Sequence, residues 1–132
     1  MSFKALLKTK EGNLVYLALR IFVGFAFMTH GYGKAFAGLK GFSSYVSELG
    51  IYFPQILGPI AAWSEFFGGA LLIVGLFTRI SSFFLACTMA VAVFVAHAGQ
   101  PFDSKELSLV YLICCLLFLM KGAGKYSLDN II

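Results

Sequence analysis

Charged residues are scarce in this chain of 132 residues. Asp, Glu, Lys and Arg together make up 12% of it, against about 25% in an ordinary soluble domain. Hydrophobic residues account for 60%, and the mean hydropathy is +0.89. A soluble chain of this length could not bury so much apolar surface, because small domains bury a smaller fraction of their surface than large ones. The composition excludes a disordered chain, a collagen-like chain and a soluble two-domain enzyme, and it predicts a protein of the lipid bilayer.

Cysteine is also rare, and its spacing excludes two kinds of site. The three cysteines are Cys87, Cys114 and Cys115, and no two of them form a CxxC motif. Neither a zinc knuckle nor a thioredoxin-type redox pair is therefore expected. All three lie inside apolar runs, where burial makes a thiol inert, so a packing role is predicted for them.

Acidic residues are fewer than basic ones, six against ten, which gives a net charge of +4. An excess of Lys and Arg can indicate nucleic-acid binding in a soluble protein. Here the cations are few and flank apolar segments, so anionic lipid headgroups are the expected partner and nucleic acid is not.

Four apolar runs divide the chain into spans. A membrane-spanning helix needs about 20 mostly apolar residues, and the runs cover about 14–35, 56–77, 80–98 and 107–121. The sequence therefore predicts an all-α, polytopic membrane protein, with one domain over residues 1–132 folded as a bundle of four transmembrane helices. The fourth run is short and lies near the lower limit for a span.

The connections between the runs differ in length. Little more than Thr78 and Arg79 joins the second run to the third, so these two helices must form an antiparallel hairpin. The connection over residues 36–55 is long, and four of its apolar residues fall on one helical face. These residues are Phe42, Tyr45, Val46 and Leu49. The pattern predicts a short amphipathic helix at the membrane interface, between the first and second spans.

The distribution of Lys and Arg predicts the orientation, because cytoplasmic loops carry an excess of both. With the N-terminus inside, six cations lie on the inner side and three on the outer side. The inner ones are Lys4, Lys8, Lys10, Arg79, Lys121 and Lys125, and the outer ones are Lys34, Lys40 and Lys105. We therefore expect a multi-pass protein with both termini in the cytoplasm.

Two charged residues, Arg20 and Glu65, lie deep within the expected spans. A charge near a helix centre costs about 2.5–3.5 kcal/mol on the insertion scale, so it usually faces the protein interior. Glu65 shares its helical face with small residues, including Gly68 and Gly69, which let helices approach closely. Glu65 is thus predicted to point inward. It could form a structural ion pair with Arg20, or it could titrate or bind a ligand.

Further polar residues gather at the outer ends of the spans. His30 and Lys34 lie near the outer end of the first span, His97 ends the third and Glu106 begins the fourth. With Glu65 below them, they predict a polar funnel that opens to the exterior. The plainer alternative is that they lie at the interface, where polar groups cost little. Two histidines on different helices could hold a haem, or join Glu65 and Glu106 around a metal, but no spacing signature supports either and no metal is predicted.

Three stretches of the chain resemble a known family. The first joins Arg20 and Gly24 to the sequence HGYGK at 30–34, the second covers 65–79, and the third is GAGKYSLD at 122–129. Together they resemble the DoxX family of small four-helix inner-membrane proteins, and the likeness extends over almost the whole chain. The resemblance implies a bacterial inner (cytoplasmic) membrane protein that is linked to thiosulfate:quinone oxidoreduction or to membrane redox complexes.

The sequence itself carries no flavin or dinucleotide fingerprint, so an electron donor would reside on a partner or in a bound ligand. With the resemblance, this favours a quinone-interacting subunit of a membrane oxidoreductase that has no covalently bound cofactor. Reducing a quinone needs two protons as well as two electrons. His97 and His30 would hydrogen-bond the quinone carbonyls, and Glu65 would relay protons. The expected substrate-binding residues are Arg20, Lys34 and Glu106.

Two other functions remain open at this point. The chain could be a non-catalytic scaffold or assembly factor that packs against partner membrane proteins, with Arg20 and Glu65 as a structural pair. It could also transport a small acid or a lipid through the funnel, which would require an oligomer because four helices form only a narrow conduit. The expected partners are accordingly the lipid bilayer, a quinone, and a redox subunit or a second copy. Whether the chain is itself an enzyme is left open.

Overall fold

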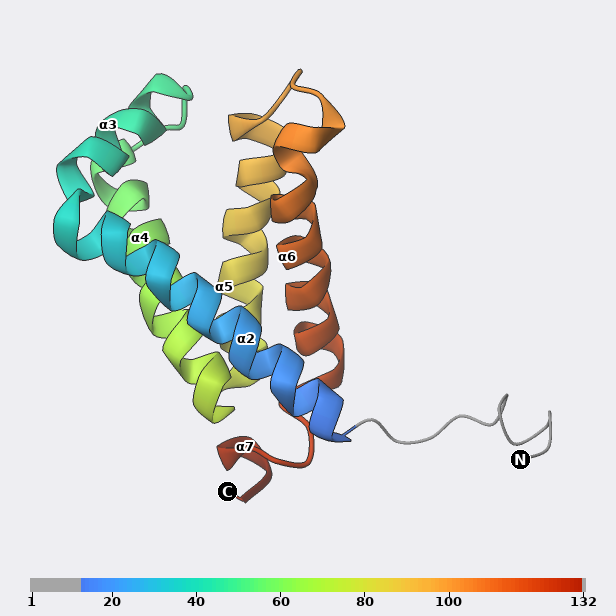
Figure 1. Cartoon of the computed structure of the whole chain (residues 1–132). Coiled ribbons are helices and arrows are strands. Elements are labelled where there is room, and N and C mark those ends of the chain that lie inside the picture. Colours follow the sequence, from blue (N-terminus) through green and yellow to red (C-terminus); the bar gives the residue numbers. More distant parts are fainter. Residues whose placement is uncertain (1–12, 132) are drawn as a thin grey trace.

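The computed structural model describes residues 13–131, and every regular element among them is helical (Figure 1). The long helices are α2 (Asn13–Tyr32), α4 (Pro54–Val74), α5 (Thr78–Val91) and α6 (Phe102–Lys121). The shorter elements are the π-helical segments η1 (Gly33–Ala37) and η2 (Ala92–Ala96), and the helices α3 (Leu39–Glu48) and α7 (Leu128–Ile131). Lys4, Lys8 and Lys10, which entered the predicted orientation, lie outside the described residues.

The four long helices form two antiparallel pairs. In Figure 1, α2 runs along α4, and α5 runs along α6. The two pairs lie close together at the end of the molecule that carries α7, and they diverge toward the end that carries α3. The start of α2 lies at the same end as α7.

Three helical segments are long and apolar enough to cross a membrane, namely Asn13–Ala37, Pro54–Val74 and Thr78–Ala96. They match the first three expected spans to within three residues at each end. The fourth helix, α6, is 20 residues long, but its first turns carry Asp103, Lys105 and Glu106. Its apolar part is therefore shorter than the roughly 20 residues that a span requires.

Glycine allows α2 and α4 to pack backbone against backbone. A Cβ atom on Gly24 would lie 2.6 Å from the carbonyl oxygen of Gly69, and one on Gly31 would overlap the backbone of Phe66. On the other side of α4, Gly68 faces the side chain of Leu85 in α5. The face of α4 that carries Gly68 and Gly69 thus packs against protein, as the small residues predicted.

The apolar core lies between α2, α4, α5 and α6. Its buried members are Val23, Phe27, Leu72, Leu85, Ala86, Met89, Cys115 and Phe118. Many other large apolar side chains are exposed. This arrangement suits a lipid solvent, which does not drive apolar side chains inward as water does.

Candidate functional site

A cavity of about 520 Å³ lies at the diverging end of the bundle and takes lining residues from α2, α3, α4, α5 and α6. This volume falls within the range of about 300–1,000 Å³ that is usual for small-molecule sites. Most of the lining is aliphatic or aromatic. Four of the polar residues that the sequence singled out also line it, namely His30, Lys34, Glu65 and His97. The structure therefore gathers four of the six predicted site residues around one space.

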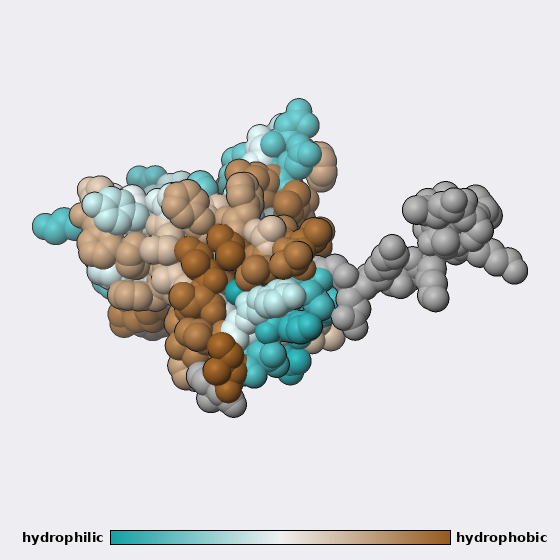
Figure 2. Space-filling model, turned by 60° about the horizontal axis from the view of Figure 1, so that its bottom comes forward, coloured by the Kyte–Doolittle hydropathy of each residue, from teal (hydrophilic) through white to brown (hydrophobic). Residues whose placement is uncertain are grey.

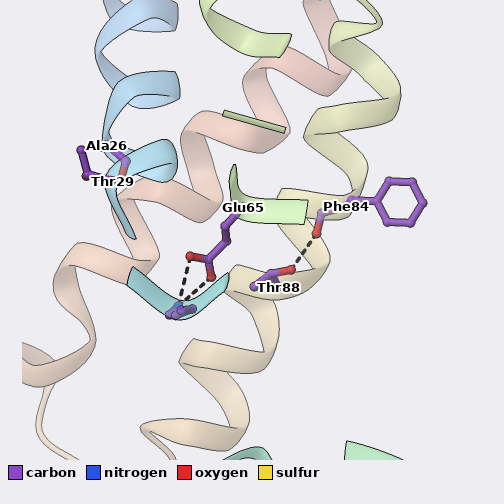
Figure 3. A network of polar contacts seen from close by, with 6 residues as sticks. Ala26, Thr29, Glu65, Phe84 and Thr88 are labelled. Atoms are coloured by element: carbon purple, nitrogen blue, oxygen red, sulfur yellow. Dashed lines mark hydrogen bonds and ion pairs between the residues drawn. The ribbon is translucent and has the colours of Figure 1, made fainter. Parts of the chain in front are cut away.

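Glu65 and Lys34 form an ion pair in the wall of this cavity. The Lys34 Nζ atom lies 2.8 Å from Glu65 Oε1 and 3.1 Å from Oε2, and Figure 3 shows both contacts as dashed lines. Glu65 is 1% exposed, whereas the side chain of Lys34 is 34% exposed. The ammonium also lies 4.9 Å from the centre of the Phe42 ring, a cation–π contact. Glu65 points inward as predicted, and its partner is Lys34.

Two π-helical segments flank the cavity and set the positions of its polar residues. Lys34 lies in η1, and His97 follows directly after η2. A π-turn adds one residue to a helical turn, and such turns are frequent at functional sites. Each segment therefore rotates the residues that follow it relative to a regular α-helix, which periodicity in the sequence does not reveal.

The histidines have different surroundings. His97 is half-buried, and its Nδ1 atom lies 2.7 Å from the carbonyl oxygen of Ala92. A carbonyl can only accept, so Nδ1 carries a proton and Nε2 is left for another partner. His30 is exposed, and its ring centre lies 6.4 Å from that of Tyr111 in α6. Both rings line the cavity, where their nitrogens can donate or accept hydrogen bonds.

The short helix α3 forms part of the cavity wall. The four apolar residues that were expected on one helical face, Phe42, Tyr45, Val46 and Leu49, all line the cavity. The connection thus contains a short helix, and the residues expected on one face contact the cavity together.

Arg20 lies away from this cavity and binds backbone carbonyl groups. Its Nε atom donates to the carbonyl oxygen of Leu72 at 2.7 Å, and Nη2 donates to those of Tyr126 at 2.9 Å and Ile73 at 3.4 Å. Nη1 donates to the carbonyl oxygen of Ala123. The carbonyls at the end of α4 carry partial negative charge, which offsets the buried guanidinium. The alternative of an Arg20–Glu65 ion pair is therefore wrong.

The segment that Arg20 binds closes the bundle at the α7 end. Within it, Asp129 accepts hydrogen bonds from the backbone N–H groups of Phe77, at 2.8 Å, and Thr78, at 3.0 Å. Burial alone would raise the pKa of Asp129, but these two bonds, together with the positive charge of Arg20, hold the pKa below its ordinary value. The Asp129 N–H in turn donates to the carbonyl oxygen of Gly75 at 2.9 Å. The 122–129 motif thus satisfies backbone groups at the turn between α4 and α5.

Glu106 does not line the cavity. It is exposed near the start of α6, whereas its neighbours Leu107 and Ser108 and the more distant Tyr111 do line it. The sequence analysis missed Tyr111. Its spacing of four residues from Leu107 places both on one helical face and could have identified it. Among residues 13–131, no three His, Cys, Asp or Glu side chains gather in a way that could hold a metal ion.

Apolar helices of spanning length around a ligand-sized cavity define a helical membrane protein with an internal cavity. The chain belongs to the DoxX family, whose sequence model matches residues 15–98. No solved structure matches the chain significantly.

Three relatives cover most of the chain. A Haemophilus influenzae protein, described as uncharacterized, is 36% identical over 85% of this chain and 86% of its own length. CatD of Bacillus subtilis, whose name provisionally designates it an oxidoreductase, is 28% identical over 91% of this chain and 88% of its own. The Escherichia coli inner membrane protein YqjF is 28% identical over 88% of this chain and 90% of its own. Together with the apolar helices, these findings support a protein of the bacterial inner membrane.

Proposed function

We propose that this protein is a membrane-embedded subunit of a redox system and that it binds a quinone in the cavity between α2 and α5. The single observation that carries the proposal is the Lys34–Glu65 pair in the wall of an otherwise mostly apolar cavity. A quinone is a flat, apolar ring with carbonyl oxygens that accept hydrogen bonds. The aromatic and aliphatic lining suits the ring, and the ammonium and imidazole groups suit the carbonyls. The residues present therefore fit this ligand.

Each polar residue receives a role from its surroundings. The Lys34 ammonium has three N–H donors and is partly exposed in the cavity wall. It can therefore donate to a ligand carbonyl oxygen while it stays bound to Glu65. Glu65 holds the ammonium in place and can pass a proton along this pair. His97, with its Nδ1 on Ala92, presents Nε2 as the second partner for the ligand, and His30 lies nearer the exposed rim. A bound quinone accepts two electrons and two protons.

A partner subunit supplies the electrons in this proposal. The chain has no flavin, dinucleotide or iron–sulfur motif in its sequence. The relative CatD carries an oxidoreductase designation in its name, which supports a place in redox chemistry for this family member as well. Arg20, held by four backbone carbonyls, is assigned a structural role, and Glu106 does not contribute to the lining.

The arrangement in the membrane forms part of the proposal. We place α6 as a fourth span, α3 at the outer interface and both termini in the cytoplasm. The start of α2 and α7 lie at one end of the molecule (Figure 1). At that end Arg79, Lys121 and Lys125 are exposed, and Figure 2 shows hydrophilic residues gathered on part of the surface there beside apolar surface. Cations at that end favour the cytoplasmic side.

Direct binding tests the proposal. The purified protein in detergent is titrated with decylubiquinone and with a short-chain menaquinone, and the bound fraction is measured by equilibrium ultrafiltration. We expect saturable binding of one quinone per chain. Ala61→Trp, which fills the cavity, should abolish it, whereas Val74→Trp on the exposed part of the same helix should not. Glu65→Gln should weaken it at least tenfold. Absence of saturable binding to the wild type would reject the quinone site and favour the non-catalytic scaffold.

A further inference from the structure

The charged pair of the cavity and His30 lie on one side of it. His30 and Lys34 come from α2 and η1, and Glu65 reaches Lys34 across the α2–α4 contact. The wall opposite is formed by α5 and the outer part of α4, where the lining includes Leu57, Ile60 and a stretch of α5. A ligand held by the Lys34–Glu65 pair therefore also meets apolar side chains of α4 and α5.

Aromatic contacts join α2 and α6 at the cavity. The ring of Phe27 lies 5.2 Å, centre to centre, from that of Tyr111, and the His30 ring lies 6.4 Å from it. Phe27 is 1% exposed. Phe27 and Tyr111 are thus in contact across the gap between α2 and α6, because ring centres at 4.5–7 Å touch.

The gap between α4 and α5 carries exposed apolar side chains. The two helices pack at Gly68 and Leu85, and they diverge from there toward the α3 end (Figure 1). Along this gap, five apolar or weakly polar residues of the two helices line the cavity and are also exposed on the molecule. They are Leu57 and Ile60 of α4 and Phe84, Cys87 and Val91 of α5. Figure 3 shows the Phe84 ring directed away from Glu65, as expected at an outer rim.

We propose that the cavity opens sideways into the lipid between α4 and α5, and that its ligand is a long-tailed lipid. The carbonyl-bearing headgroup lies at the Lys34–Glu65 wall, and the apolar tail passes out between Ile60 and Cys87. The rim of the opening offers apolar contacts, which do not bind a water-soluble substrate. A hydrocarbon tail that lies in the opening is stabilised by these contacts. The inference rests on the proposed function, since it names the route and the tail of the same ligand.

Two quinones that differ in their tails test the opening. Decylubiquinone has a long alkyl tail, and duroquinone has none; both rings are fully substituted, so neither adds to a thiol. We expect Cys87→Trp and Ile60→Trp each to weaken decylubiquinone binding at least tenfold while duroquinone binding changes less than twofold. Ile80→Trp, on an exposed position of α5 outside the cavity lining, should change neither. Circular dichroism and gel filtration check that each variant is folded, and the two rim variants lie on different helices.

The outcomes separate this inference from the proposed function. If the wild type binds both quinones and the rim variants leave decylubiquinone unaffected, the tail does not pass between α4 and α5 and the opening is rejected alone. If both quinones weaken equally in the rim variants, these residues belong to the headgroup site, which also rejects the opening. If the wild type binds neither quinone, the proposed function and the opening are rejected together.

Discussion

Removing Lys34 should destabilise this protein far more than neutralising Glu65, because the two partners differ in exposure. In Lys34→Met the Glu65 carboxylate, 1% exposed, loses both of its contacts to the ammonium, at 2.8 and 3.1 Å. Breaking a buried pair from one side in this way costs about 3–5 kcal/mol. In Glu65→Gln the Lys34 side chain, which is 34% exposed, can turn toward water. We therefore expect the unfolding free energy to fall by only about 1 kcal/mol.

The double variant Lys34→Met/Glu65→Gln completes the cycle. It leaves no unpaired charge, so we expect it to be more stable than Lys34→Met alone. The unfolding free energies are measured by far-ultraviolet circular dichroism during titration with sodium dodecyl sulfate in mixed micelles. Lys40→Met, on an exposed position of α3, is the matched control and should behave as the wild type. Equal losses in the two single variants, or a Lys34→Met variant as stable as the control, would refute the reasoning.

Three further predictions concern the frame around the site. Gly24→Ala places a Cβ against a backbone carbonyl and should lower the unfolding free energy by about 1–3 kcal/mol. Gly68→Ala meets only the flexible end of Leu85 and should lower it much less. Thermal melting compares the two variants. Asp129→Asn should cost about 1 kcal/mol through the lost N-terminal bonds of α5. The pKa of Asp129 is lower in the folded state than in the unfolded state, where it is near 3.8. The stability that Asp129 adds is therefore present above the unfolded pKa and is lost as the pH falls through the folded pKa. The difference in melting temperature between wild type and Asp129→Asn should vanish in acid. Arg20→Met should release the 122–129 segment, so that its backbone amides exchange hydrogen faster than in the wild type. Unchanged exchange would contradict the role given to Arg20.

The sequence predicted those features that depend on composition and helical periodicity. The inward direction of Glu65 followed from the small residues Gly68 and Gly69 on its face, and the structure confirms it. The apolar face of α3 and the first three apolar helices followed from spacing alone. These features are local, so a one-dimensional pattern contains the necessary information.

The pattern could not predict which groups bind the buried charges. Arg20 binds carbonyl oxygens, which every residue has, at positions 52 to 106 residues away in sequence. Lys34 was expected among the outer cations and the substrate-binding residues, but no pattern paired it with Glu65; η1 and its long side chain bring the two together. A π-turn leaves no mark in hydrophobic periodicity, so the position of Lys34 required the three-dimensional structure.

Native mass spectrometry of the protein extracted from bacterial membranes tests the central claim, a quinone in the cavity, most directly. The wild type should carry one quinone per chain, identified by its mass and by its ultraviolet spectrum after extraction. Ala61→Trp, which fills the cavity, should carry none, and Val74→Trp should carry as much as the wild type. Wild-type protein that carries only phospholipid, even after incubation with excess quinone, would contradict the account.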